Sequence, residues 1–534
     1  MQPSRWFSLA TKAPQQRIKP TAPNGNIDRM AGLLLGIHLA TDALRTTICT
    51  NRGEVIATAE SKIAAVSSPH GWLEHEPSSW WRALREAVPE AIEQTQEPAD
   101  AIRAIGLAGH AASMVLLGRE ALVSAGDRVP SLRPAIVGDA DPTRTTPPLV
   151  NDVAPSAFWA TTGRESSAAL QRLLWVREHE PDAWTRLAML AMPKDYLRLR
   201  LTSSMATDHG DACNTGLYNV VERRWDLQIA AACGIDVACL PRLCEPAEVA
   251  GVLTPGAAAA LGLPEGIPVA TGTGEVQADA IAAGVVEADA VAVRLSDDAA
   301  VFAYSDESAR ANAVLHTGVS ISCGATGQAR WLGHAHTACG LAAVKAVQRL
   351  AGSNAKQQDF AMRAADLANA SEGPELFVPH VDSCGNVQQT LFGMHGETDC
   401  NRITAAAAEG VACHVASLCD AVTAADGLTP ARPRTIRVFG SAMQSAGWLQ
   451  LVANALGIGC VRVETPVTPA FGAALLAGVA AGVWPTVRAA ARSSVVVSDA
   501  IDAEPIASAR LAKHRQRQTL LINALDSIEE SERY

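Results

Sequence analysis

Two strand–turn–strand segments of similar design, far apart in the chain, constrain the fold most. Apolar runs flank a polar turn at 40–43 in residues 33–49, and a polar turn at 296–298 in residues 290–304. The segments lie about 260 residues apart, and each is followed by alternating strand and helix signals. Such alternation indicates an α/β architecture. The repetition predicts a duplicated domain with a cleft between the two halves.

Length and composition exclude several classes of protein. The chain has 534 residues and a mass of 55.8 kDa, more than one compact core accommodates, so two or more domains are expected. Its 48% hydrophobic and 19% charged residues are typical of a folded chain, and only 4% are aromatic. The formal net charge of −11 gives no electrostatic basis for binding nucleic acid or an anionic membrane.

The first 29 residues are basic and contain several prolines. They lack the apolar stretch of a secretory signal, and the prolines break the amphipathic helix of a transit peptide. We expect a disordered extension over residues 1–30, or an upstream start that precedes the true one at Met30. The chain then continues as an N-terminal domain over 31–285, a C-terminal domain over 286–500 and a charged helical tail over 501–534.

The cysteines and the apolar stretches indicate a cytoplasmic protein. None of the twelve cysteines forms a CxxC pair, and Cys233, Cys239 and Cys244 lack the spacing of zinc ligands, so reduced thiols and no metal site are expected. The best membrane-span candidate, 470–484, is shorter than the roughly 20 residues that cross a bilayer and contains three glycines. We expect it to form a buried helix.

Several motifs resemble those of one known family. They are Gly-Ile-His-Leu-Ala-Thr at 36–41, Trp-Leu-Glu-His-Glu-Pro-Ser-Ser-Trp-Trp at 72–81, Pro-Lys-Asp-Tyr-Leu-Arg-Leu-Arg-Leu-Thr at 193–202, and Thr-Pro-Ala-Phe-Gly-Ala-Ala at 468–474. In this order they resemble the FGGY carbohydrate kinases, and most of all the xylulokinases. The resemblance covers about residues 32–485. It implies two ribonuclease-H-like lobes of the actin and hexokinase superfamily, which close on ATP and a sugar.

The first phosphate loop departs from the family pattern Gly-Ile-Asp-x-Gly-Thr-Ser. His38 stands in place of the aspartate and Ala40 in place of the glycine, whereas Thr41 is retained. An imidazole is a poor ligand for Mg²⁺, which prefers hard oxygen ligands. Asp42 offers a carboxylate from a shifted position. The resemblance therefore places His38, Thr41 and Asp42 near the phosphates.

The catalytic base of the family is the aspartate of Gly-Gly-Asp-Asn, and here the corresponding residue is Glu275. Its carboxylate extends one methylene further, so proton abstraction from a sugar hydroxyl remains chemically feasible, although a shift of about 1 Å costs on the order of 100-fold in rate. The alternative is a solvated glutamate at a helix N-terminus, stabilised by the helix dipole.

Both ligand pockets depart from the family as well. On the sugar side, the segment that reads Gln-Met-His in relatives is His110, Ala111 and Ala112, and Asp139 lies where relatives have Trp-Asn-Asp-x-Arg. A buried histidine such as His110 is also compatible with a purely structural role. On the nucleotide side the resemblance points to Asp297 in the second phosphate loop and to Gly440, Ser441 and Gln444 in the adenosine segment. Asp297 and Asp298 would repel a polyphosphate unless a cation intervened.

Two hypotheses follow. The first is an ATP- and Mg²⁺-dependent kinase for a small sugar or polyol such as xylulose, with Glu275 as its base and its activity weakened or lost. The second is a non-catalytic relative that binds a small molecule or a partner protein and signals through lobe closure. A homodimer is compatible with either.

Overall fold

The computed structural model describes residues 32–531 with several gaps. The residues outside the description are 1–31, 71, 112, 124–128, 138–161, 163–166, 289, 306–318, 327–330, 351–356, 371–372, 382–386, 425–434 and 532–534. The predicted N-terminal extension over 1–30 therefore lies outside the described residues.

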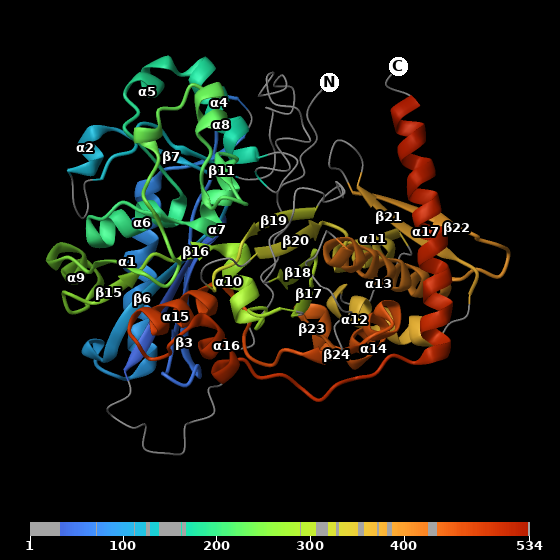
Figure 1. The fold of residues 1–534 in the computed structure, drawn as a ribbon. Coiled ribbons are helices and arrows are strands. Elements are labelled where there is room, and N and C mark those ends of the chain that lie inside the picture. Colours follow the sequence, from blue (N-terminus) through green and yellow to red (C-terminus); the bar gives the residue numbers. More distant parts are fainter. Residues whose placement is uncertain are drawn as a thin grey trace. The chain divides into compact units, whose positions relative to one another are not determined.

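The first sheet has seven strands and carries the first of the two predicted strand–turn–strand segments (Figure 1). β1 and β2 are antiparallel, as are β2 and β3, whereas β6 runs parallel to β1. The order is β14-β15-β6-β1-β2-β3, and β16 also pairs with β6. The bounds are β1 Leu33–Leu39, β2 Ala43–Cys49, β3 Val55–Lys62, β6 Ile102–Gly109, β14 Val249–Val252, β15 Pro268–Ala270 and β16 Thr273–Gly274.

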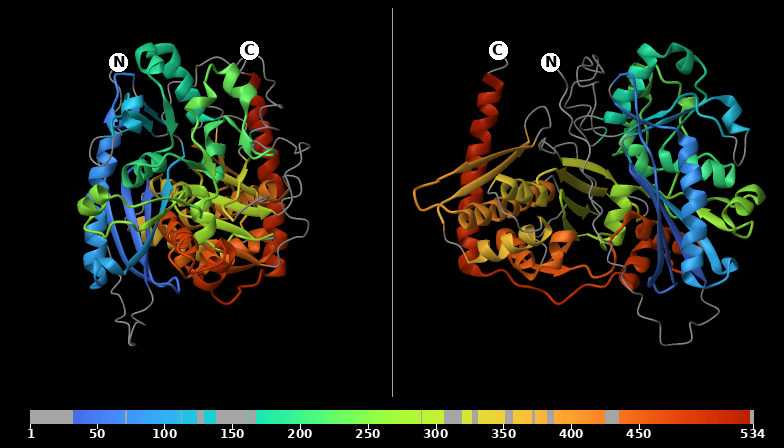
Figure 2. Two further views of the ribbon diagram at one scale, coloured as in Figure 1. Left: turned by 60° about the vertical axis from the view of Figure 1, so that its left-hand side comes forward. Right: turned by 180° about the vertical axis from the view of Figure 1, so that it is seen from behind.

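The second sheet has six strands and repeats this design (Figures 1 and 2). β17 and β18 form an antiparallel pair joined by a short turn, β20 extends it in antiparallel fashion, and β23 runs parallel to β17. The order is β19-β20-β18-β17-β23-β24. The bounds are β17 Val291–Leu295, β18 Ala299–Ser305, β19 Val319–Cys323, β20 Trp331–Thr337, β23 Thr435–Phe439 and β24 Gly459–Arg462. The predicted α/β fold with a duplicated domain is confirmed.

Helices and short strands surround the two sheets. The first sheet with the elements up to α10 is called the first lobe below, and the second sheet with α11–α14 and α17 the second lobe. The helices are α1 Pro77–Thr95, α2 Arg119–Leu122, α4 Ala168–His179, α5 Pro181–Thr185, α6 Pro193–Thr202, α7 His209–Ala212, α8 Leu227–Ala232, α9 Pro255–Leu261, α10 Glu275–Ala282, α11 Leu341–Leu350, α12 Gln357–Asn369, α13 Cys400–Ala424, α14 Ala446–Leu456, α15 Pro469–Ala480, α16 Val487–Ser494 and α17 Pro505–Ser531. The short strands are β4 Val66–Ser67, β5 Leu73–His75, β7 Val115–Leu117, β8 Ala135–Val137, β9 Met189–Ala191, β10 Thr207–Asp208, β11 Tyr218–Asn219, β12 Arg224–Trp225, β13 Leu243–Cys244, β21 Leu376–Val381 and β22 Val387–Phe392.

α15 packs against β1 and β6 of the first sheet, although it follows the last strand of the second. Two strand glycines allow the approach. A Cβ added to Gly36 would lie 1.8 Å from the Ala470 carbonyl oxygen, and one added to Gly106 would lie 1.9 Å from that of Ala473. The helix is buried from Ala470 to Gly478, which confirms most of the buried helix predicted over 470–484, but it ends at Ala480 and residues 481–483 are exposed. Glycines on the strands and alanines on α15 let the helix and the sheet pack closely, as a dense protein core requires.

α13 is the longest apolar helix of the described residues. Its segment Cys400–Thr423 is long and apolar enough to cross a membrane, with a mean hydropathy of 1.3, but 72% of it is buried inside the protein. The candidate predicted from the sequence is 470–484 instead. Burial on this scale is what the central helix of a folded core shows.

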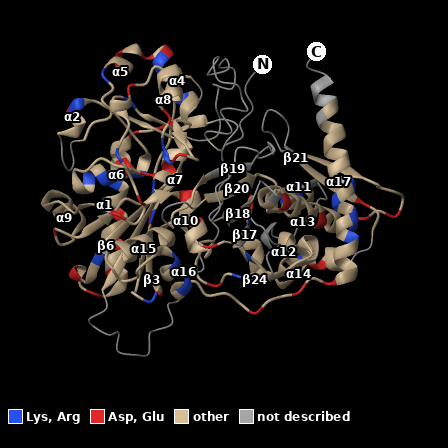
Figure 3. Ribbon diagram, in the orientation of Figure 1, with Lys and Arg blue, Asp and Glu red and all other residues tan. Residues whose placement is uncertain are grey.

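The C-terminal segment forms α17, which lies against α13 (Figure 3). Arg510 and His514 both contact Glu409, and the Gln518 side chain donates to the carbonyl oxygens of Phe377 and Gly410 at 3.3 and 3.0 Å. A charged helix was predicted here. Its inward face is fixed to the second lobe by these polar contacts.

Candidate active site

His38 and Glu275 meet where β1 ends and α10 begins. β16 pairs with β6, and this pairing places Gly274 beside Gly109 and delivers Glu275 next to the end of β1. His38 Nε2 lies 3.4 Å from Glu275 Oε2; the His38 side chain is 7% exposed and that of Glu275 37%. Burial raises the pKa of Glu275, but its interactions with His38 and His110 outweigh burial and hold this pKa below its usual range.

His110 follows β6 directly and lies beside these two residues. Its backbone N–H donates to the Leu39 carbonyl at 2.9 Å, and its side chain is almost fully buried. Burial lowers the pKa of His110 to about 4, so the imidazole is neutral near pH 7. Neither ring nitrogen has a hydrogen-bond partner among the described residues. The site therefore contains a buried, neutral group with one donor and one acceptor to offer.

His75 lies in the same region as His38, Glu275 and His110, and it was not predicted as a site residue. Its Nδ1 accepts a hydrogen bond from Trp80 Nε1 at 3.0 Å, while its Nε2 has no partner in the described part of the chain. Burial lowers its pKa to about 4, so Nε2 carries the proton. The Trp80 ring meets His110 edge-on, with 5.9 Å between centroids. The only signal in the sequence was its position inside the 72–81 motif.

The other residues predicted on the sugar side, Ala111, Ala112 and Asp139, add little to the geometry of the site. Ala111 follows His110 in the same loop. Ala112 and Asp139 lie outside the described residues.

Asp42 and Thr41 lie in the turn between β1 and β2, and both are exposed. The Arg45 guanidinium binds both carboxylate oxygens of Asp42, at 2.9 and 2.7 Å. This hydrogen bonding, opposed by partial burial, keeps the pKa of Asp42 below its usual value. The carboxylate that was expected to offer a shifted metal ligand is thus occupied by an arginine.

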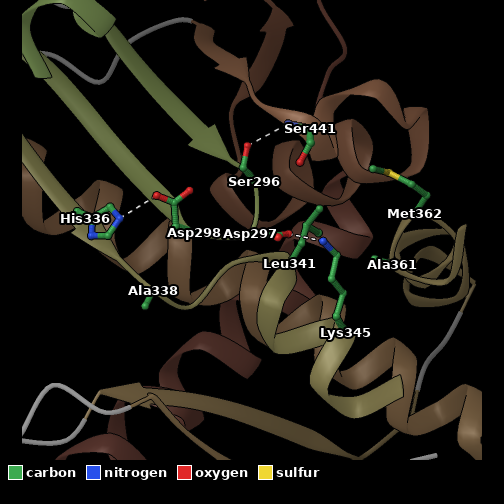
Figure 4. A pocket seen from close by; sticks show the side chains of 10 residues that line it. All are labelled: Ser296, Asp297, Asp298, His336, Ala338, Leu341, Lys345, Ala361, Met362 and Ser441. Atoms are coloured by element: carbon green, nitrogen blue, oxygen red, sulfur yellow. Dashed lines mark hydrogen bonds and ion pairs between the residues drawn. The ribbon is translucent and has the colours of Figure 1, made fainter. Parts of the chain in front are cut away.

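The turn between β17 and β18 lines a cavity of about 770 Å³ in the second lobe (Figure 4). Asp297 pairs with Lys345 of α11. Asp298 contacts Arg294 at 2.6 Å and His336 at 2.8 Å. Burial raises the pKa of Asp298, but the hydrogen bond to His336 and the charge of Arg294 hold it below its ordinary value. The repulsion expected between these aspartates and a polyphosphate is therefore offset by three basic side chains that sequence reasoning missed.

The predicted adenosine segment is only partly in this cavity. Ser441 lines it and its backbone N–H donates to Ser296 Oγ at 3.1 Å. Gly440 has φ 106°, and a Cβ there would lie 2.4 Å from the Leu295 carbonyl oxygen, so only glycine fits. Gln444 is exposed and is not one of the residues that line the cavity. The structure thus brings Asp297, Gly440 and Ser441 together.

Arg294 connects this cavity to α10. Its Nη1 lies 3.2 Å from Asp279 Oδ2, one helical turn beyond Glu275. Burial raises the pKa of Asp279 to about 7 despite the nearby Arg294 charge. Asp279 and Arg294 were not predicted, since nothing in their spacing marks them as partners.

A buried charge cluster supports the strand that leads into Glu275. Lys194 Nζ lies 2.6, 3.0 and 3.3 Å from carboxylate oxygens of Asp195, Asp208 and Asp211. Asp208 also accepts a hydrogen bond from Thr273 Oγ1 at 2.8 Å, in β16. All four charged side chains of the cluster are fully buried. The 193–202 motif therefore holds β16, which directly precedes Glu275, through the contacts of Lys194 and Asp208.

Mg²⁺ does not fit the carboxylates near the site. Asp42, Asp297 and Asp298 are each paired with basic side chains, and Glu275 faces an imidazole. Within the described ranges, no three His, Cys, Asp or Glu side chains are grouped so that they could hold a metal ion. A hard divalent cation prefers several oxygen ligands, and the three aspartates near this site are already paired with basic side chains.

Comparison with known proteins assigns the family. The sequence pattern of the FGGY family of carbohydrate kinases, N-terminal domain, matches residues 33–282, and that of the C-terminal domain matches residues 282–481. Together they cover most of the chain. The protein belongs to the FGGY family of carbohydrate kinases, as its motifs had indicated.

Individual relatives agree with this assignment. A xylulose kinase of Escherichia coli is 28% identical over 459 residues, which cover 84% of this chain and 90% of the relative. The solved xylulose kinases of Rhodospirillum rubrum and Lactobacillus acidophilus superpose with TM-scores of 0.81 and 0.82 at 20% and 17% identity. They cover 93% and 92% of this chain, and 99% and 98% of their own. These structures bear on the fold alone and confirm the two-lobed kinase architecture.

Proposed function

We propose that this protein keeps the fold and the two ligand-binding regions of a sugar kinase, but that its ATP-dependent phosphorylation of a sugar or polyol such as xylulose is weakened or lost. The observation that carries the proposal is the contact of His38 with Glu275, at 3.4 Å. In the family pattern these two positions are aspartates that serve the metal, the phosphates and the acceptor hydroxyl.

The pairing weakens Glu275 as a base. An effective general base has a pKa near the working pH and is free to reach the acceptor proton. Here the contact with His38 helps to hold the Glu275 pKa below its usual range. Abstraction of a hydroxyl proton would require breaking this contact, and the longer side chain also shifts the carboxylate from the position of an aspartate.

Nucleotide binding in the second lobe would be weak for a related reason. The cavity of about 770 Å³ lies within the usual range of ligand sites, so its size suits a nucleotide. Lys345 and His336 are the basic groups lining the cavity that would meet its phosphates, but Lys345 already contacts Asp297 and His336 already contacts Asp298. A triphosphate has to compete with these carboxylates, without a metal ion to bridge them.

A second candidate function is binding of a small polar ligand without turnover. The observation that favours it is the pair of buried histidines, His75 and His110: Nε2 of His75 and both ring nitrogens of His110 lack partners among the described residues. Buried polar groups normally have hydrogen-bond partners, so unmatched donors and an acceptor point to a ligand that supplies them. Neutral imidazoles suit hydroxyl groups, which both donate and accept.

The test is ADP release by the purified protein with ATP, Mg²⁺ and a panel of sugars and polyols. We expect release far below the roughly 1–100 per second of typical kinases. His38→Asp should raise it because the variant restores a hard metal ligand, whereas Thr41→Ser, which keeps the hydroxyl of the same turn, should not. Release at ordinary kinase rates in the unaltered protein would contradict the proposal, and Glu275→Ala would then show whether Glu275 serves as the base. If every protein is inactive, binding of the same sugars and polyols decides for the second candidate.

A further inference from the structure

Asp297 lies between two different parts of the cavity wall in the second lobe (Figure 4). His336 and Asp298 line the cavity on one side of it, and Ala361 and Met362 of α12 line it on the other. The cavity volume of about 770 Å³ accommodates a ligand of nucleoside size. A ligand that enters here therefore meets a carboxylate with an apolar wall beside it.

The Asp297 carboxylate is more accessible than the ammonium group paired with it. The exposed fraction of the side chain is 64% for Asp297 and 23% for Lys345. A carboxylate has about four lone-pair sites, so Asp297 can accept hydrogen bonds from ligand hydroxyls while it stays paired with Lys345. A phosphate group in the same place would be repelled, because both groups are negatively charged. This part of the wall therefore favours hydroxyl groups over phosphates.

Backbone amides near the turn are already engaged. Free N–H groups at a helix N-terminus are a common phosphate site. At the start of α11, however, the Leu341 N–H donates to the Ser296 carbonyl oxygen at 2.7 Å, and the Ala342 N–H donates to that of Asp297 at 3.1 Å. The Ser441 N–H donates to Ser296 Oγ at 3.1 Å. The turn thus uses three donors that could otherwise bind a phosphate.

The apolar wall suits a planar ring. Ala361 is fully buried, and its carbonyl oxygen accepts a hydrogen bond from Trp448 Nε1 at 2.8 Å, so this part of α12 is fixed to α14. Met362 is partly buried and packs against the core of the second lobe. A methionine thioether makes favourable contacts with aromatic rings. Carboxylates, in turn, are common acceptors for ribose hydroxyls in nucleotide sites. The two features together match a base and a ribose.

We propose that this cavity binds a nucleoside without phosphates, with its ribose hydroxyls on Asp297 and its base against Met362. Each phosphate added to the ligand weakens binding, because it meets the carboxylates of Asp297 and Asp298 and the amide groups beside them are engaged. This preference rests on the proposed function, in which the cavity keeps a nucleotide-sized ligand while phosphate transfer is weakened or lost.

The first test is calorimetric titration of the unaltered full-length protein with adenosine, AMP, ADP and ATP. The ionic strength is held constant and a chelator removes divalent cations. We expect adenosine to bind most tightly, with a Kd about tenfold or more below that of ATP, and AMP and ADP to lie between them. Equal affinities, or an affinity that increases with each phosphate, would overturn the proposal. So would the absence of adenosine binding at millimolar concentration.

The proposed function fails on different results. These are ADP release at ordinary kinase rates, or ATP binding that Mg²⁺ tightens. The order of the four affinities without Mg²⁺ depends on neither. Slow turnover together with an affinity that increases with phosphate number would leave the proposed function intact and remove the preference for a nucleoside.

Asp297→Asn separates the two effects of the carboxylate. The variant lacks the charge that repels phosphates and accepts ribose hydroxyls less strongly. The Kd for ATP should therefore fall several-fold while the Kd for adenosine rises several-fold. Damage to the fold would instead raise both. Asp182→Asn is the control and should change neither, because Asp182 is exposed in α5 of the first lobe. Constants that move in the same direction in Asp297→Asn would contradict the assignment of Asp297 to the ribose.

Discussion

Two polar regions lie next to the same strand ends of the first lobe, and they differ in how their charges are matched. In the Lys194 cluster every charge is buried and touches opposite charges at 2.6 to 3.3 Å. Around Glu275, one carboxylate faces one imidazole, and two further histidines have unmatched nitrogens among the described residues. The first region has the character of a scaffold and the second that of a binding surface. Retained scaffold motifs therefore say little about retained chemistry.

The largest effect is expected from breaking the scaffold. Lys194→Met leaves three buried carboxylates without their shared cation, and removing one partner of a buried ion cluster costs about 3–5 kcal/mol. Chemical unfolding of the variant and the parent measures the loss. Lys62→Met is the control, because Lys62 is 72% exposed and pairs only at the surface. An equally small change in both variants would remove the distinction between the two regions.

The next effect is on the pH dependence of stability, through Asp279. Its pKa is about 7 in the folded protein against an ordinary value of 3.8, so the folded state holds a proton that the unfolded chain releases near pH 4. The free energy of unfolding should therefore fall as the pH rises from about 4 to 7 and then level off. Asp279→Asn should remove this contribution, up to a few kcal/mol. Unfolding curves at several pH values measure it, and parallel pH profiles for the two proteins would contradict it.

A smaller effect, on the affinity for ATP, should distinguish the β17–β18 turn from the β1–β2 turn. Asp297→Asn removes the carboxylate that pairs with Lys345 beside the cavity, so affinity for ATP should rise several-fold, roughly 1 kcal/mol. Asp42→Asn is the matched control in the first turn and should leave affinity unchanged, since Asp42 is bound by Arg45 and is not one of the cavity residues. Calorimetric titration of each variant gives the comparison. A gain in Asp42→Asn alone would reverse the roles of the turns.

The smallest effect is expected on stability at the binding surface. Glu275→Gln should change the free energy of unfolding by less than about 1 kcal/mol, because the side chain is over a third exposed and its contact with His38 is long. The measurement is the same chemical unfolding used for Lys194→Met. A loss as large as that of Lys194→Met would make Glu275 a structural residue.

Much of the fold could be predicted from the sequence, because the signals are local. The two strand–turn–strand segments were recognisable from apolar runs and polar turns, and the parallel strands β6 and β23 then complete the same arrangement in both sheets. The residues of the candidate site were harder to predict from the sequence. Arg294, His336 and Lys345 contact Asp297 or Asp298 from other elements. Contacts between separate elements produce no periodic pattern in the sequence, so they could not be predicted from it. His75 was missed since its role depends on the Trp80 ring.

The central claim is that the residues for metal-assisted phosphate binding are no longer in place, and calorimetric titration of the unaltered protein with ATP, with and without Mg²⁺, tests it most directly. We predict weak binding, near the millimolar range, that Mg²⁺ leaves unchanged. Binding that Mg²⁺ tightens about tenfold or more would contradict the account, because it would require carboxylates that the structure places in ion pairs with basic side chains.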